Sequence, residues 1–348
     1  TTHYMDFKPI VGSYVFHKGK LHKVPATDSE ALKSSLMGLF EKRRCQKFLV
    51  YVQNYKKDDA STHNSYDLTK MTCAELFSKF SLDENTQDFL GHASALYTND
   101  EYLSKPALDL VERLQLYSNS LGRYSNSPYI YPLYGLGELP QAFSRLSAVY
   151  GGVYMLSAPI KEVKFNADGT FLGVESSEEG SPVAKAKLVV ADPTYFPDKV
   201  KKVGEVVKVI CILSHPVPNT DNSESCQIII PQKQVKRKSD IYVAVMSSAN
   251  CVVPKGKFVA IVSTTVETAN PEAECDVATK LLGPIDEKFT FVEPLYEPLA
   301  DGTKDKVFIS KSYDATSHFE TTVDDCLDMY RRITGKDFVF KEAKEDEE

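Results

Sequence analysis

The sequence lacks the features that mark membrane-spanning and secreted proteins. None of its apolar runs approaches the ~18 residues needed to cross a bilayer, and no charged segment followed by an apolar core marks a signal peptide. Its seven cysteines are scattered, odd in number and without a CxxC pair, which is typical of a reduced chain. We therefore expect a soluble, cytoplasmic protein.

The signatures of common enzyme classes are also missing. The chain has no G-x-S-x-G elbow, no P-loop, no H-x-x-x-H spacing and no G-x-G-x-x-G turn for a dinucleotide. Gly135 and Gly137 lead into Glu138, whose carboxylate would repel a phosphate. His92 and His318 lie beside apolar neighbours, so we interpret them as structural residues. We expect no catalytic residue, no metal and no cofactor.

Acidic residues outnumber basic ones, 48 to 41, and give the chain a net charge of −7. This charge argues against nucleic acid as a partner and favours a basic one. The charged and apolar fractions are those of a globular protein, and 348 residues are too many for one simple core. We expect two or three compact units.

The most strongly patterned stretch is YGLGELPQAFSRLSAVYGGVYM at residues 134–155. Its glycines, its Glu138–Pro140 start and its apolar spacing predict a loop, a short helix, a tight stop and a strand at 153–155. Glu138 and Arg145 are seven residues apart and fall on nearly the same helix face. They are either ordinary solvated charges or part of a surface that serves a partner.

Residues 25–122 read as four or five helices with almost no strand. Apolar residues between 32 and 52 recur every three or four positions and predict a long helix interrupted near Gly38, and Pro106 suits the start of another helix. Three pairs have the spacing of a capping box: Thr27 with Glu30, Thr72 with Glu75, and Ser81 with Glu84. The pattern indicates an all-helical unit inserted into a strand-rich chain.

The rest of the chain is richer in strand signals. Hairpins are predicted at 12–25, around a turn at 17–20, and at 159–174, around a turn at 166–169. A short buried strand is expected at 186–190, and further strands at 206–213, 227–230, 241–246, 258–263 and 306–310. Residues 272–290 and 321–334 have helical spacing, and residues 336–348 form a charged tail.

Several long motifs are specific enough to compare with a family. They are SLMGLFEKRR at 35–44, RYSNSPYIYP at 123–132, ADPTYFPDK at 191–199, CILSHPVPNT at 211–220, CQIIIPQKQVKRKSDIYV at 226–243, LLGPIDEKF at 281–289 and SYDATSHFET at 312–321. Together with residues 134–155, they resemble the Rab GDP-dissociation inhibitors and, in part, the Rab escort proteins.

The resemblance implies an α/β fold with a sheet domain like that of flavin monooxygenases and amine oxidases, but without flavin. Members of the family begin with a dinucleotide-type βαβ unit that this sequence lacks, so the chain looks truncated at its N-terminus. The implied domains are a discontinuous Rab-binding sheet domain at 1–24 and 123–348, an inserted helical prenyl-binding domain at 25–122, and the charged tail at 336–348.

The function implied by the resemblance is that of a binding protein. It would hold GDP-bound, prenylated Rab GTPases, inhibit GDP release and recycle them between membrane and cytosol, as a monomer in transient contact with membranes. One alternative is a Rab escort protein, an accessory subunit of Rab geranylgeranyltransferase whose large insertions are missing here. The other is a flavin-dependent oxidoreductase.

The resemblance also implies three sets of site residues. The Rab-binding platform contains Glu138, Gln141, Arg145, Tyr154 and Met155. A mobile effector loop, which helps in membrane delivery, contains Arg123, Tyr124, Ser127, Pro128, Tyr129 and Tyr131. The geranylgeranyl lipid would contact Met37, Phe40, Phe48, Leu49, Phe89, Leu96, Leu110 and Leu114, each of which otherwise suits the core of the helical unit.

Overall fold

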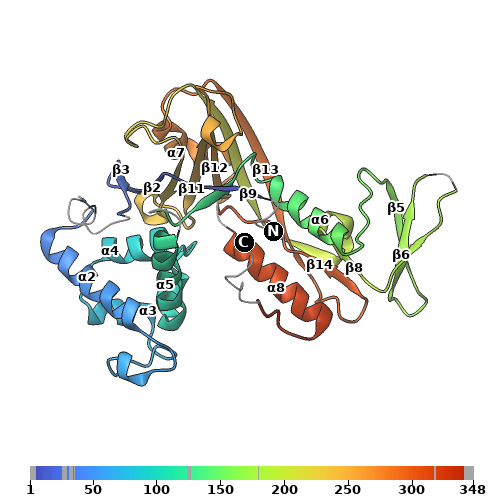
Figure 1. The fold of residues 1–348 in the computed structure, drawn as a ribbon, viewed down its shortest axis with the longest axis horizontal. Coiled ribbons are helices and arrows are strands. Elements are labelled where there is room, and N and C mark those ends of the chain that lie inside the picture. The colour runs from blue at the N-terminus through green and yellow to red at the C-terminus, as the bar shows by residue number, and fades with distance from the viewer. Residues whose placement is uncertain are drawn as a thin grey trace. The chain divides into compact units, whose positions relative to one another are not determined.

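The largest sheet of the protein has seven strands (Figure 1). In spatial order they are β13 (Glu287–Pro298), β9 (Val200–Leu213), β12 (Phe258–Thr265), β11 (Ile241–Ser247), β10 (Cys226–Ile230), β2 (Gly12–His17) and β3 (Lys20–Lys23). The structure is a computed structural model that describes residues 5–25, 30, 34, 36–123, 127–178, 180–316 and 319–340. The sheet and the helices confirm a mixed α/β fold.

The chain divides into two compact units. The first takes residues 1–150, 207–291 and 315–317, and the second takes residues 151–206, 292–314 and 318–348. The core of the first unit is formed by buried β-branched residues on β9 to β12, with Cys275, Ala278 and Leu282 packed against them from η8 (Glu272–Cys275), α7 (Asp276–Leu281) and the residue after it. All five residues of β10 are buried, and three of them are isoleucines.

Two strand pairs of the first unit follow the local signals in the sequence. The predicted hairpin at 12–25 is confirmed, because β2 and β3 pair antiparallel across Lys18 and Gly19, both in the left-handed region. Strand β10 pairs parallel with β2 and antiparallel with β11. A separate short pair joins β1 (Phe7–Pro9) to β4 (Ile130–Pro132).

Residues 39–123 contain helices joined by turns and no named strand, as the sequence predicted. The helices are α2 (Leu39–Asn54), α3 (Cys73–Lys79), α4 (Glu84–Asp88), the π-helix η2 (Phe89–Ser94) and α5 (Ala107–Arg123), with short 3-10 helices η1 (Ala60–Thr62) and η3 (Asp100–Ser104). They enclose their own core, in which the Phe48 ring meets those of Phe77 and Phe80 edge-on at 5.5 and 5.3 Å. Gly91 is required in η2, because a Cβ there would collide with the Tyr102 hydroxyl.

The first residues of the helices test the capping predictions, of which one is correct and one is wrong. Thr72 and Glu75 form the expected capping box at α3. The prediction for Ser81 is wrong: the Asp83 carboxylate accepts the Thr86 N–H and caps α4, while Ser81 is left-handed at φ 53°. Helix α2 begins at Leu39, directly after the extended Gly38, and the Thr27 prediction lies outside the described residues.

The helical prediction for residues 272–290 is correct only in its first half. Helices η8 and α7 end at Leu281, and the left-handed Gly283 breaks the helix at φ 80°. Residues 287–298 form strand β13 instead. The aromatic and β-branched residues of this segment suit a strand as well as a helix. Its pairing with β9 at the edge of the sheet makes it a strand.

The second unit contains a three-stranded sheet, a two-stranded sheet and one long helix. Strands β5 (Ile160–Phe165), β6 (Phe171–Ser176) and β7 (Ala184–Lys185) form the first sheet, which confirms the hairpin around residues 166–169. Strand β8 (Val189–Ala191) pairs parallel with β14 (Val307–Ile309). It begins later than predicted and is half-exposed, not buried. Helix α8 (Glu320–Thr334) matches its prediction.

No helix in the described ranges combines the length and the apolar character that crossing a bilayer requires.

Candidate functional site

Helix α6 (Glu138–Val149) is held at its start by a turn with two left-handed residues, Tyr134 at φ 68° and Gly135 at φ 99°. Gly135 is buried, and a Cβ there would lie 3.4 Å from Val252 Cγ1. The Tyr134 N–H donates to the Asn250 carbonyl at 3.0 Å. These contacts fix the start of α6 against the segment that follows β11.

Most side chains of α6 are accessible. Of its residues, all of which are described, only Ala142 is buried. Glu138 is half-buried in the first turn, where a carboxylate interacts favourably with the helix dipole. Gln141 and Arg145 are exposed. Because Phe143 is also 57 % exposed, α6 presents charged, polar and apolar groups to solvent, as an interaction surface does.

Tyr154 and Met155 belong to the start of the second unit. Their side chains are 55 % and 75 % exposed, and they lie in an irregular segment at 152–155. The strand predicted at 153–155 is therefore wrong. Val153 and Tyr154 are residue types that favour strands, but among the described residues no neighbouring strand pairs with this segment.

The candidate effector loop begins at Arg123, the last residue of α5, and ends in strand β4. Ser127 is buried, and its hydroxyl donates to the Tyr129 carbonyl at 3.1 Å. That carbonyl also accepts the Ile10 N–H at 3.0 Å, and Tyr131 is half-buried in β4. Pro128 lies between these anchored residues, while Tyr124 lies outside the described residues. The end of the loop is thus tied to the strand pair β1–β4.

The eight lipid-site candidates do not form one group. Phe48, Leu110 and Leu114 are buried in the helical core. Phe40 and Leu49 on α2 are exposed, and Leu96 is half-buried with a left-handed backbone at φ 60°. Met37 and Phe89 line a pocket together.

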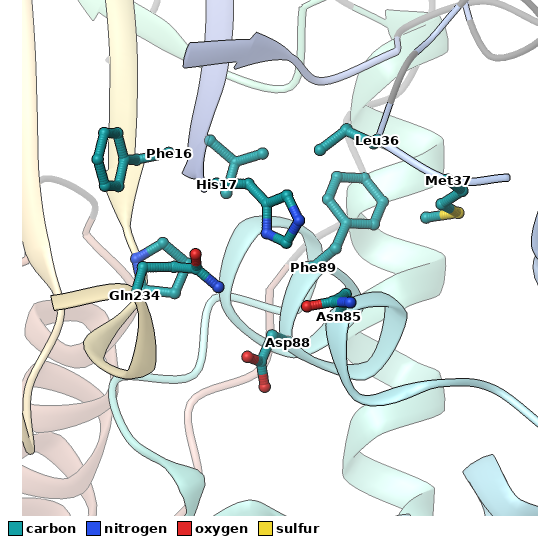
Figure 2. A pocket seen from close by; sticks show the side chains of 10 residues that line it. Phe16, His17, Leu36, Met37, Asn85, Asp88, Phe89 and Gln234 are labelled. Carbon is teal, nitrogen blue, oxygen red and sulfur yellow. The ribbon is translucent and has the colours of Figure 1, made fainter. Parts of the chain in front are cut away.

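This pocket lies between the β2–β3 hairpin and the α4–η2 segment (Figure 2). Figure 2 shows the rings of His17 and Phe89 turned toward each other, with Leu36 and Met37 beside Phe89. The cavity measures about 20 Å³. Sites for drug-sized ligands measure roughly 300–1,000 Å³, so a lipid chain fits only if these side chains move apart.

A buried charge network joins the helical segment to the sheet within the first unit. His92 on η2 is 1 % exposed, and its Nδ1 lies 2.7 Å from Asp240 Oδ2 while its Nε2 lies 3.1 Å from Asp100 Oδ1. Burial alone lowers the pKa of His92, but the hydrogen bonds to the Asp100 and Asp240 carboxylates outweigh it and raise the pKa to about 10. His92 is therefore a structural cation at neutral pH.

Among the described residues, one group has the spacing of metal ligands, and it belongs to the same network. Ligand atoms of Asp88, His92 and Asp100 lie within 4.8 Å of one another. However, the Lys233 ammonium lies 3.0 Å from Asp88 and 3.4 Å from Asp100, and both His92 nitrogens are hydrogen-bonded to carboxylates. A metal would have to displace these partners, so the group functions as an ion network.

Sequence comparison places the chain in a family. The sequence model of the family described as GDP dissociation inhibitor matches residues 1–345. The chain belongs to this family. It is 55 % identical over 348 residues to the Rab GDP-dissociation inhibitor of Saccharomyces cerevisiae, an alignment that covers 99 % of this chain and 76 % of the relative.

Two further members of the family match the chain at similar coverage. The chain is 56 % identical to the probable secretory pathway GDP dissociation inhibitor 1 of Schizosaccharomyces pombe, over 98 % of this chain and 77 % of that protein. A crystal structure of the Rab GDI from Plasmodium falciparum superposes with a TM-score of 0.93 at 43 % identity, covering 97 % of this chain and 78 % of that one. These relatives are named GDP dissociation inhibitors or Rab GDI, which favours that class over an escort protein or a flavin enzyme.

Proposed function

We propose that the chain binds GDP-bound, prenylated Rab GTPases, inhibits their release of GDP and carries them between membrane and cytosol. The observation that carries this proposal is the 55 % identity, along the whole chain, to a protein named Rab GDP-dissociation inhibitor. A protein that binds the GDP-bound form more tightly than the nucleotide-free form by some factor strengthens GDP binding by the same factor, and inhibited release is the kinetic counterpart that we propose.

The Rab-binding platform is assigned to Glu138, Gln141 and Arg145 on α6, together with Tyr154 and Met155. Three features support the assignment. The start of α6 is fixed by the turn at Tyr134 and Gly135, its polar residues are accessible, and exposed apolar side chains accompany them. A rigid element with charged and apolar groups suits a specific protein interface.

The effector loop is assigned to Arg123, Tyr124, Ser127, Pro128, Tyr129 and Tyr131, and we propose that it assists membrane delivery. Its end at β4 is anchored by the hydrogen bond from the Ile10 N–H to the Tyr129 carbonyl, and loops held on a rigid scaffold often carry binding functions. The sheet domain at 1–24 and 123–348 would hold the GTPase, and the helical domain at 25–122 would hold the lipid.

The helical domain is proposed to take up the geranylgeranyl group. A C20 chain gains about 0.8 kcal/mol per CH₂ on leaving water, a driving force on the order of 15 kcal/mol that only another apolar environment can match. Of the eight candidates, Met37 and Phe89 suit direct contact, because they line a pocket near the surface. Phe48, Leu110 and Leu114 lie in the helical core against which Met37 and Phe89 pack.

We further propose that the protein acts as a monomer in the cytoplasm, without a cofactor and without catalysis. All three sets of assigned residues lie within one chain. The expected absence of chemistry rests on the missing catalytic motifs and on the names of the relatives as inhibitors.

Affinity measurements with four forms of one Rab GTPase test the function. The full chain is titrated with geranylgeranylated and unprenylated Rab, each loaded with GDP or with a non-hydrolysable GTP analogue. We expect the GDP form to bind at least about tenfold more tightly than the GTP form, and prenylation to strengthen binding further. Equal affinity for the GDP and GTP forms would contradict the proposal.

A further inference from the structure

Two exposed lysines mark the turn between β2 and β3. Lys18 and Lys20 flank the left-handed Gly19, and neither forms an ion pair with any acidic residue that the structure describes. Both line an open depression of about 440 Å³. Gly38, the residue before α2, lines the same depression, so the hairpin turn lies next to the start of that helix.

The outer face of α2 carries exposed apolar and basic side chains. Leu39 is 65 % exposed and Phe40 is 74 % exposed, although both sit on a regular helix with a buried inner face. Arg43 and Lys47 are exposed three and seven residues after Phe40, and they therefore share its side of the helix. Exposed Leu and Phe side chains beside Lys and Arg are residue types that anchor proteins in a membrane interface.

We propose that Lys18, Lys20, Leu39, Phe40, Arg43 and Lys47 form a basic-apolar face that docks on a bilayer containing anionic phospholipids. The cations attract the lipid phosphates, and the two apolar side chains enter the boundary between headgroups and acyl chains. The molecule as a whole carries a charge of −7 and is repelled by such a surface. Attraction therefore has to come from a local cluster.

The acidic residues near this face leave it positive. Asp83 lines the depression, but its carboxylate is engaged in capping α4. Glu41, on the inner side of α2, is buried and paired with Arg44. Glu84, next to Asp83, is also exposed, so the four cations at Lys18, Lys20, Arg43 and Lys47 outweigh two exposed carboxylates.

The position of this face gives it a role in lipid transfer, which rests on the proposed function. Leu36 and Met37 line both the depression and the small pocket that contains Phe89 (Figure 2). Docking would bring the mouth of that pocket to the headgroup layer. A prenyl chain would then pass from the bilayer into the protein without crossing bulk water, where each exposed CH₂ is unfavourable.

Co-sedimentation of the full chain with vesicles tests this inference. The vesicles are phosphatidylcholine alone, or phosphatidylcholine with about one-third phosphatidylserine. We expect the wild type to bind the anionic vesicles and not the neutral ones. The double variant Lys18→Glu/Lys20→Glu should bind at least about tenfold more weakly, and Phe40→Ser should also bind more weakly.

A matched control uses Lys185→Glu/Lys187→Glu, which changes the net charge equally at exposed positions in the second unit. This variant should bind the anionic vesicles within about twofold of the wild type. Equal losses in the two double variants, equal binding to both vesicle types, or no binding by the wild type would each overturn the inference. Displacement by inorganic phosphate beyond that by chloride of equal ionic strength would indicate a free-phosphate site instead and would also overturn it.

Affinity for unprenylated GDP-bound Rab in solution separates this inference from the proposed function. If Lys18→Glu/Lys20→Glu loses vesicle binding and keeps Rab binding, the basic-apolar face is supported. If the wild type binds Rab but no vesicles, the inference fails and the proposed function stands. If it binds anionic vesicles but no Rab, the face is retained as a membrane site and the proposed function fails.

Discussion

His92 Nδ1 lies 2.7 Å from Asp240 Oδ2, although the two residues are 148 positions apart in the sequence. His92 belongs to the π-helix η2, and Asp240 immediately precedes β11. The second carboxylate oxygen of Asp240 accepts the Gln232 N–H at 2.8 Å. This buried pair therefore fixes the helical segment to the seven-stranded sheet and holds the pocket residue Phe89 near the β2–β3 hairpin.

We predict that Asp240→Asn strongly destabilises the fold. The substitution leaves a buried imidazolium without its closest counter-charge, and breaking a buried pair in this way costs about 3–5 kcal/mol. Urea unfolding followed by circular dichroism measures the loss. Asp198→Asn, at an exposed position, is the control and should change the free energy of unfolding by less than ~0.5 kcal/mol. Equal effects of the two substitutions would show that the pair contributes nothing specific.

The same network predicts how stability depends on pH. The folded-state pKa of His92 is raised from 6.5 to about 10, so its contribution is complete below pH 6.5 and is lost as the pH rises toward 10. The hydrogen bond from His92 lowers the pKa of Asp100 from 3.8 to about 2, so the contribution of Asp100 is present above pH 3.8 and is lost as the pH falls toward 2.

Unfolding free energies of the wild type and His92→Asn, measured from pH 6 to pH 10, test the alkaline limb. The wild type should lose stability more steeply than the variant over this range, because only the wild type releases the imidazolium proton. Parallel curves for the two proteins would mean that His92 is neutral in the folded state.

On α6, we predict that Arg145→Ala and Glu138→Ala affect binding and not folding. Exposed charges usually change stability by less than ~0.5 kcal/mol, whereas truncating one partner of an interface ion pair costs roughly 2–5 kcal/mol. Arg145→Ala should therefore keep its thermal midpoint, and Glu138→Ala should lose no more than the helix-dipole interaction of about 0.3–1 kcal/mol. Both variants should bind GDP-loaded Rab at least about tenfold more weakly. Arg331→Ala on α8 is a control that removes another exposed arginine. Lower melting with unchanged affinity would instead identify structural charges.

For the lipid site, Met37→Ser and Phe89→Ser should weaken binding of geranylgeranylated Rab and spare the unprenylated form. Each removes apolar surface from the pocket, which corresponds to about 1.5–3 kcal/mol for a fully buried side chain. Titration with both forms of Rab measures the difference. The exposed Leu299→Ser, in the second unit, should leave both affinities unchanged.

A substitution in the helical core should lower stability and should not distinguish prenylated from unprenylated Rab. Leu110 is fully buried, so Leu110→Ala should lower the free energy of unfolding by about 2–5 kcal/mol and affect both forms of Rab alike. If Phe89→Ser behaved in the same way as Leu110→Ala, Phe89 would be a core residue and the pocket assignment would be contradicted.

Local rules predicted the elements whose signals lie within a few residues. The turn at Lys18 and Gly19 and the capping box of Thr72 and Glu75 both formed where the sequence placed them. The prediction for Ser81 failed because α4 begins at Glu84, so that Asp83, two residues after Ser81, occupies the capping position. The predictions for β13 and for residues 152–155 were wrong because pairing with another strand determines whether such a segment forms a strand. The spacing of residues in the sequence does not reveal that pairing.

The candidate site was predicted to different degrees. Helical periodicity was sufficient to place Glu138 and Arg145 on an accessible face of α6. For the lipid residues, apolar character alone did not distinguish the buried Leu110 from the pocket residue Phe89, because both suit a helical core. The ion pair of His92 and Asp240 had no sequence signal, since its partners meet only through the tertiary fold.

The rate of GDP release from geranylgeranylated Rab tests the central claim most directly. Rab loaded with a fluorescent GDP analogue is chased with excess unlabelled GDP, with and without a molar excess of this chain. The account predicts that the wild type slows release at least about tenfold and that Arg145→Ala slows it much less at the same concentration. A release rate unchanged by the wild type, at concentrations where binding is complete, would contradict it.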